Sequence, residues 1–173
     1  MNNLIFRNYS EAKKAFSMSA LRDPSNLQVT IDLAALSIQN RDYAGYRKCY
    51  QKLIGQLSGR GNFWIGMMVG YCLEGNYTKC LEAIDVYRST LNPKPSYEQQ
   101  ELLLLEVRCY VNMNNLPKAI STLHDKMSVV LNEYYAKEQL AILYGKNHQY
   151  KESQAIWEEL LQRSFSSSFI INR

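Results

Sequence analysis

The stretch Gly75-Asn76-Tyr77-Thr78-Lys79-Cys80 has the composition of a short turn that leads into a helix. A helical pattern of large apolar residues that begins at Trp64 precedes it, and another follows it. Residues equivalent to Tyr77 recur at intervals of 34, 34, 39 and 34 residues, at Tyr9, Tyr43, Tyr77, Leu116 and Tyr150. A period of this length indicates that copies of one helix-turn-helix unit stack against one another.

The 34-residue period is typical of tetratricopeptide repeats. We therefore predict an all-α, right-handed tetratricopeptide superhelix of about four and a half helix-turn-helix repeats. The five additional residues before Leu116 coincide with Asn92-Pro93-Lys94-Pro95, which interrupts the helical pattern. All predicted parts belong to one array: residues 1–25 as the second helix of a truncated repeat, 26–60, 61–95, 96–132 and 133–163 as repeats, and 164–173 as a tail.

The two ends of the chain do not match complete repeats. Only eight residues precede Tyr9, too few for the first helix of its unit. After Gln162 the pattern loses its helical period, and no capping helix with a polar outer face follows. We therefore expect a fragment of a longer array. Inside the array, Ser96 and Gln99 have the spacing of a capping box that opens a helix.

The composition favours a chain that stays out of the membrane. Hydrophobic residues make up 46% of the sequence, but no apolar run approaches the roughly 18 residues that span a bilayer. The first seven residues are too polar for a signal peptide. We therefore expect no membrane partner.

The cysteines and histidines indicate neither a metal nor a cofactor. The four cysteines form no Cys-x-x-Cys pair, and all fall at helical positions: Cys49, Cys72, Cys80 and Cys109. In a reducing compartment such cysteines are usually small buried residues. His124 and His148 have no partner at the spacing of metal ligands. We predict no metal site and no cofactor.

Motifs that carry catalytic chemistry are absent from the sequence. It contains no glycine-rich phosphate loop, no Gly-x-Ser-x-Gly and no His-Glu-x-x-His. The acidic pair Glu158-Glu159 is typical of a solvated helix face rather than of acid–base catalysis. We therefore predict that the chain is not an enzyme.

Positive charge is concentrated at the start of the chain. Residues 1–60 contain nine Lys and Arg against four Asp and Glu, whereas residues 61–173 contain eleven against twelve. The basic residues are Arg7, Lys13, Lys14, Arg22, Arg41, Arg47, Lys48, Lys52 and Arg60. A solvated helix face explains such a cluster, and so does a surface that binds RNA phosphates with release of counterions.

A second candidate surface is the concave groove that the first helix of each repeat lines. On the predicted register this groove is unusually apolar, and Ala35, Val111 and Ile142 also face it. Its other candidate residues are Ile31, Ile38, Ile65, Val69, Leu73, Leu104 and Arg108. An exposed apolar groove indicates a protein partner or another segment of the same chain. The alternative is that the superhelix closes over the groove.

One stretch is more specific than a generic repeat. Residues 32–47 read Asp-Leu-Ala-Ala-Leu-Ser-Ile-Gln-Asn-Arg-Asp-Tyr-Ala-Gly-Tyr-Arg. The core Gln-x-Arg-Asp-x-x-Gly-Tyr-Arg resembles the N-terminal repeats of the auxiliary subunit of the N-terminal acetyltransferase A (NatA) complex. Further similar pieces follow in the same order: Asn26-Leu27-Gln28, Trp64-Ile65-Gly66 and Glu101-Leu102-Leu103-Leu104. The resemblance covers roughly residues 5–163.

The resemblance implies a cytoplasmic, ribosome-associated scaffold. Subunits of this family wrap a small GNAT-fold catalytic subunit, which acetylates nascent N-termini, and they dock the complex on the ribosome. The family protein is several times longer than 173 residues. Contact with the catalytic subunit is therefore expected mostly through regions outside this chain, and contact with the ribosome through the basic residues. The alternative function is a generic tetratricopeptide module that binds a peptide or helix in its apolar groove.

Overall fold

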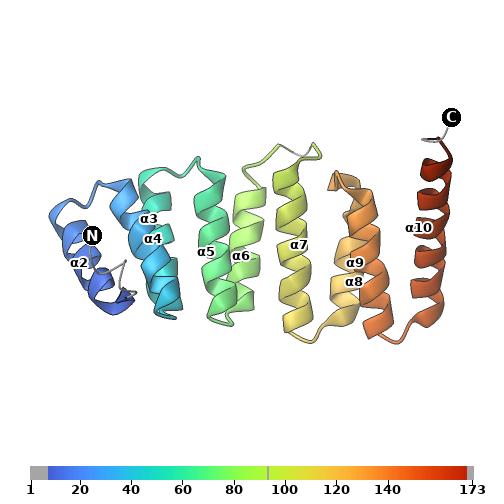
Figure 1. Cartoon of the computed structure of the whole chain (residues 1–173), viewed down its shortest axis with the longest axis horizontal. Coiled ribbons are helices and arrows are strands. Elements are labelled where there is room, and N and C mark those ends of the chain that lie inside the picture. The colour runs from blue at the N-terminus through green and yellow to red at the C-terminus, as the bar shows by residue number, and fades with distance from the viewer. Residues whose placement is uncertain (1–7, 93, 171–173) are drawn as a thin grey trace. The chain divides into compact units, whose positions relative to one another are not determined.

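The computed structural model describes residues 8–92 and 94–170, with the backbone alone for residues 164–170. Arg7 lies outside the described residues. Within them, the chain forms nine α-helices, one short 3-10 helix and no strand (Figure 1). The predicted all-α class is confirmed.

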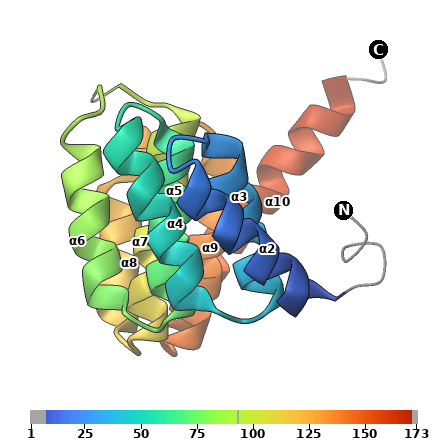
Figure 2. The same cartoon turned by 90° about the vertical axis from the view of Figure 1, so that its left-hand side faces the viewer.

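The chain divides into two compact units between Tyr87 and Arg88. The first contains α2 (Tyr9–Arg22), α3 (Leu27–Gln39), α4 (Tyr43–Gln56), α5 (Gly61–Leu73) and α6 (Tyr77–Arg88) as far as Tyr87. The second contains α7 (Tyr97–Asn112), α8 (Leu116–Asp125), the 3-10 helix η1 (Met127–Val129), α9 (Glu133–Lys146) and α10 (Tyr150–Ile170). Helices that follow one another pack side by side, as α2, α3, α4 and α5 do in the first unit (Figure 2).

The periodic residues of the sequence mark the same structural position in every repeat. Each is the first residue of a helix, in the order α2, α4, α6, α8 and α10: Tyr9, Tyr43, Tyr77, Leu116 and Tyr150. The residue two positions earlier has a left-handed backbone in four turns: Arg41, Gly75, Asn114 and His148, with φ of 55°, 73°, 56° and 61°. The intervals that the sequence shows are therefore the intervals between identical turns.

A common hydrogen bond closes these four turns. The amide of the residue after the left-handed position donates to the carbonyl five residues back, as Asp42 does to Ser37 at 2.8 Å and Asn76 to Tyr71 at 2.9 Å. This is the bond that ends a helix in the Schellman motif. The next helix then begins at once, because the side chain of Asp42 accepts a hydrogen bond from the Gly45 amide at 2.9 Å. Local chemistry thus specifies the whole turn.

The predicted capping box at the start of α7 forms only in part. The Ser96 side chain accepts a hydrogen bond from the Gln99 amide at 3.1 Å, as expected. The Gln99 side chain, however, donates to the carbonyl of Asn92 at 3.1 Å. It is buried there and ties the loop before α7 to the helix. The neighbouring Gln100 accepts hydrogen bonds from the amides of Leu131 and Asn132.

In the first unit, α4 and α5 pack closely because α5 lacks side chains where they meet. A Cβ atom on Gly70 would lie 2.8 Å from Cβ of Arg47, and one on Gly66 would lie 2.4 Å from the ring of Tyr50. The buried ring of Tyr46 fits against the same bare surface, 3.2 Å from where the Gly70 Cβ would be. Glycine here provides space rather than conformational freedom.

The core of the second unit joins α7, α8 and α9. Leu103 and Leu123 are fully buried there, as are two small residues that let the helices approach: Ala119 and Ala136. A buried carboxylate lies beside this core. Glu106 accepts a hydrogen bond from Arg88 at 2.6 Å and two from Lys126 at 2.8 and 2.9 Å. Two cations thus compensate the buried charge.

The final helix is longer than the sequence predicted. The tail was expected to begin at residue 164, whereas α10 runs to Ile170. Residues 164–170 contain no proline or glycine. Serine and phenylalanine each disfavour a helix by only about 0.5 kcal/mol relative to alanine, so they do not end one that is already formed. None of the described helices has both the length and the apolar composition needed to cross a membrane.

Candidate functional site

A groove lies between α7 and α9 in the second unit. It holds a pocket of about 170 Å³ whose lining comes from one face of each helix. The lining residues are Leu104, Val107, Arg108 and Val111 from α7, and Tyr135, Gln139, Ile142, Leu143 and Lys146 from α9. We call these residues the α7–α9 groove. Because α7 and α9 are the first helices of two successive repeats, the α7–α9 groove is part of the surface for which the sequence predicted a groove.

The structure brings several of the predicted groove residues together here. Leu104 and Arg108 line the pocket with Val111 and Ile142, which the helical register also assigned to the groove. The sequence reasoning missed Lys146, although it lies four residues after Ile142 and therefore on the same helix face. The groove is less apolar than expected, because two cations lie beside its apolar floor.

The predicted groove residues of the first unit are placed differently. Ile38 and Val69 pack against the buried cluster of Ala34, Tyr46 and Cys49. Among the others, Leu73 is 40% exposed, while Ile31 and Ile65 are half-buried. For Ile38 and Val69, core packing accounts for the apolar side chain without any partner.

Two of the predicted basic residues are engaged in ion pairs within the first unit. Lys13 on α2 pairs with Asp42, the cap of α4. Arg47 on α4 donates from Nε to both carboxylate oxygens of Glu74 at 2.9 Å, and its guanidinium lies 5.0 Å from the centre of the Tyr71 ring. Arg47 therefore fastens α4 to the end of α5, which leaves it less able to bind a phosphate.

Four lysines gather where α2 meets α4. The Lys13 ammonium, which donates to Asp42, holds the pKa of that carboxyl below its ordinary value, and the charge of Lys48 acts in the same direction. Burial raises the pKa of the Cys49 thiol, whereas the charges of Lys52 and Lys13 oppose that rise. Lys48 and Lys52 are four residues apart on one face of α4, and the Lys13–Asp42 ion pair brings α2 to the start of the same helix.

Lys14 extends this group into an open hollow of about 580 Å³, which Ser10, Ser17 and Asn40 also line. We call Lys13, Lys14, Lys48 and Lys52 the α2–α4 basic cluster. The other predicted basic residues of the described chain lie at turns and helix ends: Arg22, Arg41 and Arg60. The Arg60 guanidinium lies 6.0 Å from the centre of the Phe63 ring.

Three of the four cysteines are buried, as predicted. Cys49, Cys80 and Cys109 are buried, and Cys72 is half-buried. In the first unit, the sulfur atoms of Cys72 and Cys80 lie 3.3 Å apart across the α5–α6 hairpin.

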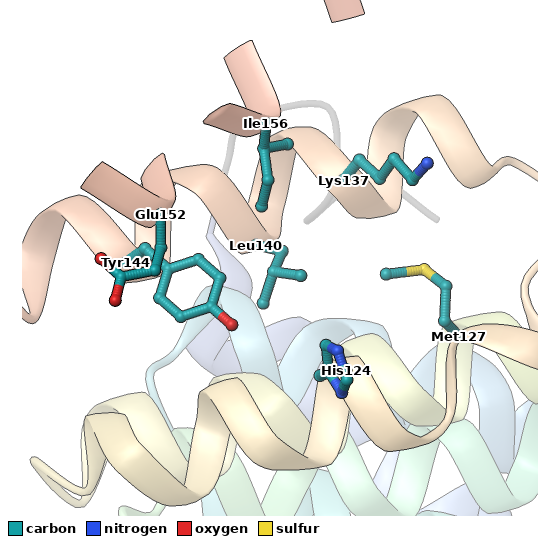
Figure 3. A pocket seen from close by; sticks show the side chains of 7 residues that line it. All are labelled: His124, Met127, Lys137, Leu140, Tyr144, Glu152 and Ile156. Carbon is teal, nitrogen blue, oxygen red and sulfur yellow. The ribbon is translucent and has the colours of Figure 1, made fainter. Parts of the chain in front are cut away.

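A further pocket of about 370 Å³ lies where α8 and η1 face α9 and α10 (Figure 3). Figure 3 shows His124 and Met127 on one side, Leu140 and Tyr144 from α9, and Ile156 from α10. Lys137, at its edge, is held by Glu133 at 2.8 Å and Glu159 at 2.7 Å. Because this lysine is already paired with two carboxylates, the pocket offers mainly apolar contacts.

Comparison with known proteins shows that the chain is similar to a group of auxiliary subunits. It is 29% identical over 160 residues to the N-terminal acetyltransferase A complex auxiliary subunit NAA15 of Arabidopsis thaliana. It is 26% identical over 161 residues to N-alpha-acetyltransferase 16, NatA auxiliary subunit, of Homo sapiens. These matches cover 90% and 91% of the chain but only 18% and 19% of the relatives. The chain thus spans less than a fifth of their length. No family model matches the chain.

Solved structures give the same result. The structure of Naa15/Naa10 bound to HypK-THB contains a chain with a TM-score of 0.81 and 26% identity, covering 93% of this chain and 25% of that one. MamA has a TM-score of 0.67 at 11% identity, covering 96% and 95%. The tetratricopeptide-like repeats of a putative kinesin light chain have a TM-score of 0.67 at 13% identity, covering 96% and 92%. At such identities MamA and the kinesin light chain show the fold alone, which is the predicted tetratricopeptide fold.

The relatives are named as auxiliary subunits, which is the class that the sequence predicted, rather than as catalytic ones. In sequence and in fold, the chain is similar to NatA auxiliary subunits over nine-tenths of its length, and the resemblance seen in residues 32–47 is confirmed.

Proposed function

We propose that this chain is part of a non-catalytic scaffold in a NatA-type N-terminal acetyltransferase complex. The observation that carries the proposal is the match to auxiliary subunits over 90% of the chain, together with a TM-score of 0.81 to a chain of the Naa15/Naa10 structure. The partner is a GNAT-fold catalytic subunit, contacted mostly through regions outside this chain. The chain itself supplies a stack of helix hairpins and no chemical step.

A pull-down tests the scaffold role. The full-length native protein is captured from its own cells, and its partners are identified by mass spectrometry. The expected result is co-purification of a GNAT-type acetyltransferase in near-stoichiometric amount. Recovery of the full-length protein with unrelated partners and without any acetyltransferase would contradict the proposal.

We further propose that the α2–α4 basic cluster contacts ribosomal RNA and keeps the complex on the cytoplasmic ribosome. The four lysines come from two helices, and Lys14 and Lys48 are exposed. Asp42 pairs with Lys13, and among the described residues no carboxylate forms an ion pair with Lys14, Lys48 or Lys52. A net positive surface of this kind attracts phosphates and releases their counterions on binding.

The salt dependence of ribosome binding tests this contact. The triple variant Lys14→Glu, Lys48→Glu, Lys52→Glu removes three cations without disturbing the Arg47–Glu74 pair. Binding of the 173-residue chain to purified ribosomes is measured by co-sedimentation between 50 and 200 mM salt. Each lost phosphate contact lowers the slope of log K against log salt by about one. We therefore expect weaker binding and a slope shallower by about three.

The matched control is Lys94→Glu, Lys118→Glu, Lys151→Glu, which changes three exposed lysines of the second unit. It is expected to bind like the native chain. Equal loss of binding in the control, or an unchanged slope in the triple variant, would show that the α2–α4 basic cluster is not the contact.

The alternative function, capture of a peptide or helix, is favoured by one observation. The α7–α9 groove holds a pocket of about 170 Å³, and two large apolar residues that line it, Tyr135 and Ile142, are exposed.

A further inference from the structure

The floor of the α7–α9 groove is apolar and open to solvent. Val107 and Leu143 are buried beneath it, and Leu104 and Val111 are half-buried beside them. Tyr135 and Ile142 remain 39% and 38% exposed, although both are large enough to be buried in a core. A partner that covered them would remove apolar surface from water, which is the main favourable term in most associations.

Two cations border this floor without any carboxylate partner. Arg108 and Lys146 are exposed, and among the described residues neither forms an ion pair. The side chains one helical turn away are all uncharged: Leu104, Leu105, Val111 and Asn112 around Arg108, and Ile142 and Leu143 before Lys146, the last residue of α9. This differs from the α2–α4 region, where Lys13 and Arg47 already have carboxylate partners.

The charge is also concentrated at one end of the groove. The helices α7 and α9 run in the same direction (Figure 1), and both cations lie toward their C-terminal ends. The first carboxylates back along the same faces are Glu101, seven residues before Arg108, and Glu138, eight residues before Lys146. Each is therefore about two turns away. The helix dipole accounts for a cation in the last turn of α9, but Arg108 lies a full turn before the end of α7.

We propose that the α7–α9 groove binds an amphipathic helical segment of a partner protein that bears Asp or Glu beside its apolar anchors. In this complex, apolar side chains of the partner helix, spaced i, i+4, cover Ile142 and Tyr135 of the groove. The acidic side chains of the partner helix pair with Arg108 and Lys146. The proposal rests on the alternative function given above, capture of a peptide or helix, and specifies the chemistry of that partner. It does not rest on the scaffold function or on the α2–α4 basic cluster.

Other occupants fit the groove less well. A second copy that docked the same groove face to face with its helices parallel to these would bring its own Arg108 and Lys146 against these cations, and like charges repel. The antiparallel arrangement avoids this repulsion, and the sedimentation measurement below distinguishes it. An RNA strand would find two cations but would cover an apolar floor that offers its phosphates nothing. An acidic amphipathic helix satisfies both parts of the surface.

Selection from a random peptide library tests the proposal. The immobilised 173-residue chain is panned against phage that display random 16-residue peptides. Three variants are compared with it: Arg108→Glu/Lys146→Glu, Ile142→Asp, and Lys118→Glu/Lys151→Glu as a control with the same change of charge on another surface. Circular dichroism confirms that each variant has the helix content of the native chain.

We expect the native chain and the control to enrich peptides with apolar residues at i, i+4 and an excess of Asp and Glu. Arg108→Glu/Lys146→Glu should enrich Lys and Arg instead, and Ile142→Asp should enrich nothing. For the best peptide, replacing its acidic residues with Gln or Asn should weaken Kd on the order of tenfold, as measured by fluorescence anisotropy, since two exposed ion pairs are lost.

Three results would overturn the proposal: enriched peptides without acidic excess, enrichment that the Arg108→Glu/Lys146→Glu change leaves unaltered, or no enrichment. A dimer in sedimentation that Ile142→Asp makes monomeric would assign the groove to a second copy. Binding of a single-stranded oligonucleotide that Arg108→Glu/Lys146→Glu abolishes would assign it to RNA. No ribosome or acetyltransferase enters this test, so its failure leaves the scaffold proposal standing.

Discussion

Arg41 has both a positive charge and a left-handed backbone, and only the charge is visible in the sequence. It belongs to the basic N-terminal third, but its backbone has φ 55°, the conformation that Gly75 adopts in the equivalent turn. A non-glycine residue in this region is strained by roughly 1–2 kcal/mol because Cβ approaches its own carbonyl. The turn thus requires a positive φ at this position, whatever the charge of the side chain.

Replacing Arg41 with glycine should stabilise the chain. Relief of the strain exceeds the greater entropy that glycine loses on folding, so Arg41→Gly is expected to raise the free energy of unfolding by about 0.5–1 kcal/mol. Urea denaturation followed by circular dichroism measures this. Arg41→Ala is the matched control, because it removes the same charge and keeps the strain. Equal stability of the two variants would refute the explanation.

At the level of whole helices, the contact between α4 and α5 depends on two glycines that have ordinary helical backbones. Helix propensity predicts that Gly66 and Gly70 destabilise α5, since glycine disfavours a helix by about 1 kcal/mol relative to alanine. In the structure, Tyr50 of α4 occupies the space beside Gly66, and Arg47 and Tyr46 occupy the space beside Gly70. Tight packing between the helices outweighs the loss of propensity within one.

We predict opposite effects for two glycine-to-alanine changes. Gly70→Ala should lower the free energy of unfolding by about 1–3 kcal/mol, because the new Cβ meets both Cα and Cβ of Arg47 and the backbone has to move. Gly55→Ala, on the open side of α4, has no atom within 4 Å and should raise it by about 0.5–1 kcal/mol. Chemical denaturation of both variants decides the matter. If both stabilise, packing does not require Gly70.

On the scale of the whole molecule, ion pairs in both units make stability depend on pH. A hydrogen bond from Lys13 lowers the pKa of Asp42 from 3.8 in the first unit. In the second, a hydrogen bond from Lys137 lowers the pKa of Glu133 and that of Glu159 from 4.5. Hydrogen bonds to Glu133 and then to Glu159 raise the pKa of Lys137 above 10.5.

The sign follows from which charged forms the folded state favours. Carboxylates with a lowered pKa contribute their full stabilisation at pH values above their ordinary pKa, and that stabilisation is lost as the pH falls through the lowered pKa. Lys137, whose pKa is raised, contributes its full stabilisation at pH values below its ordinary pKa. That stabilisation is lost as the pH rises through the raised pKa. We therefore expect a plateau from about pH 5 to about pH 10 and falling stability on both sides.

Melting temperatures recorded by circular dichroism between pH 2.5 and 7 test the acid side. Lys137→Gln should melt at a lower temperature on the plateau and lose less on acidification, because Glu133 and Glu159 then lack the hydrogen bond that lowers their pKa most and keep only Arg163 as a cationic partner. An identical loss in the native chain and in Lys137→Gln would show that this network contributes nothing.

The sequence by itself determined the phase of the repeat. Tyr9, Tyr43, Tyr77, Leu116 and Tyr150 each begin a helix, and four of the five share a turn that a few neighbouring residues specify. Caps, left-handed positions and helical periodicity act over one or two turns of chain, so a single sequence shows them. The end of α10 was missed because nothing local marks it: its last residues contain neither proline nor glycine.

Only the tertiary structure decided which charges remain available. Lys13 and Asp42 are 29 residues apart, and Arg47 and Glu74 are 27 apart, so their pairing depends on how successive hairpins stack. The same stacking brings α7 beside α9 and makes Lys146 part of a groove that sequence patterns predicted as apolar. Which charged side chains meet depends on distances between residues that lie far apart in the sequence, and no local rule gives those distances. Only the structure therefore shows that Lys13 and Arg47 have carboxylate partners, whereas Arg108 and Lys146 have none among the described residues.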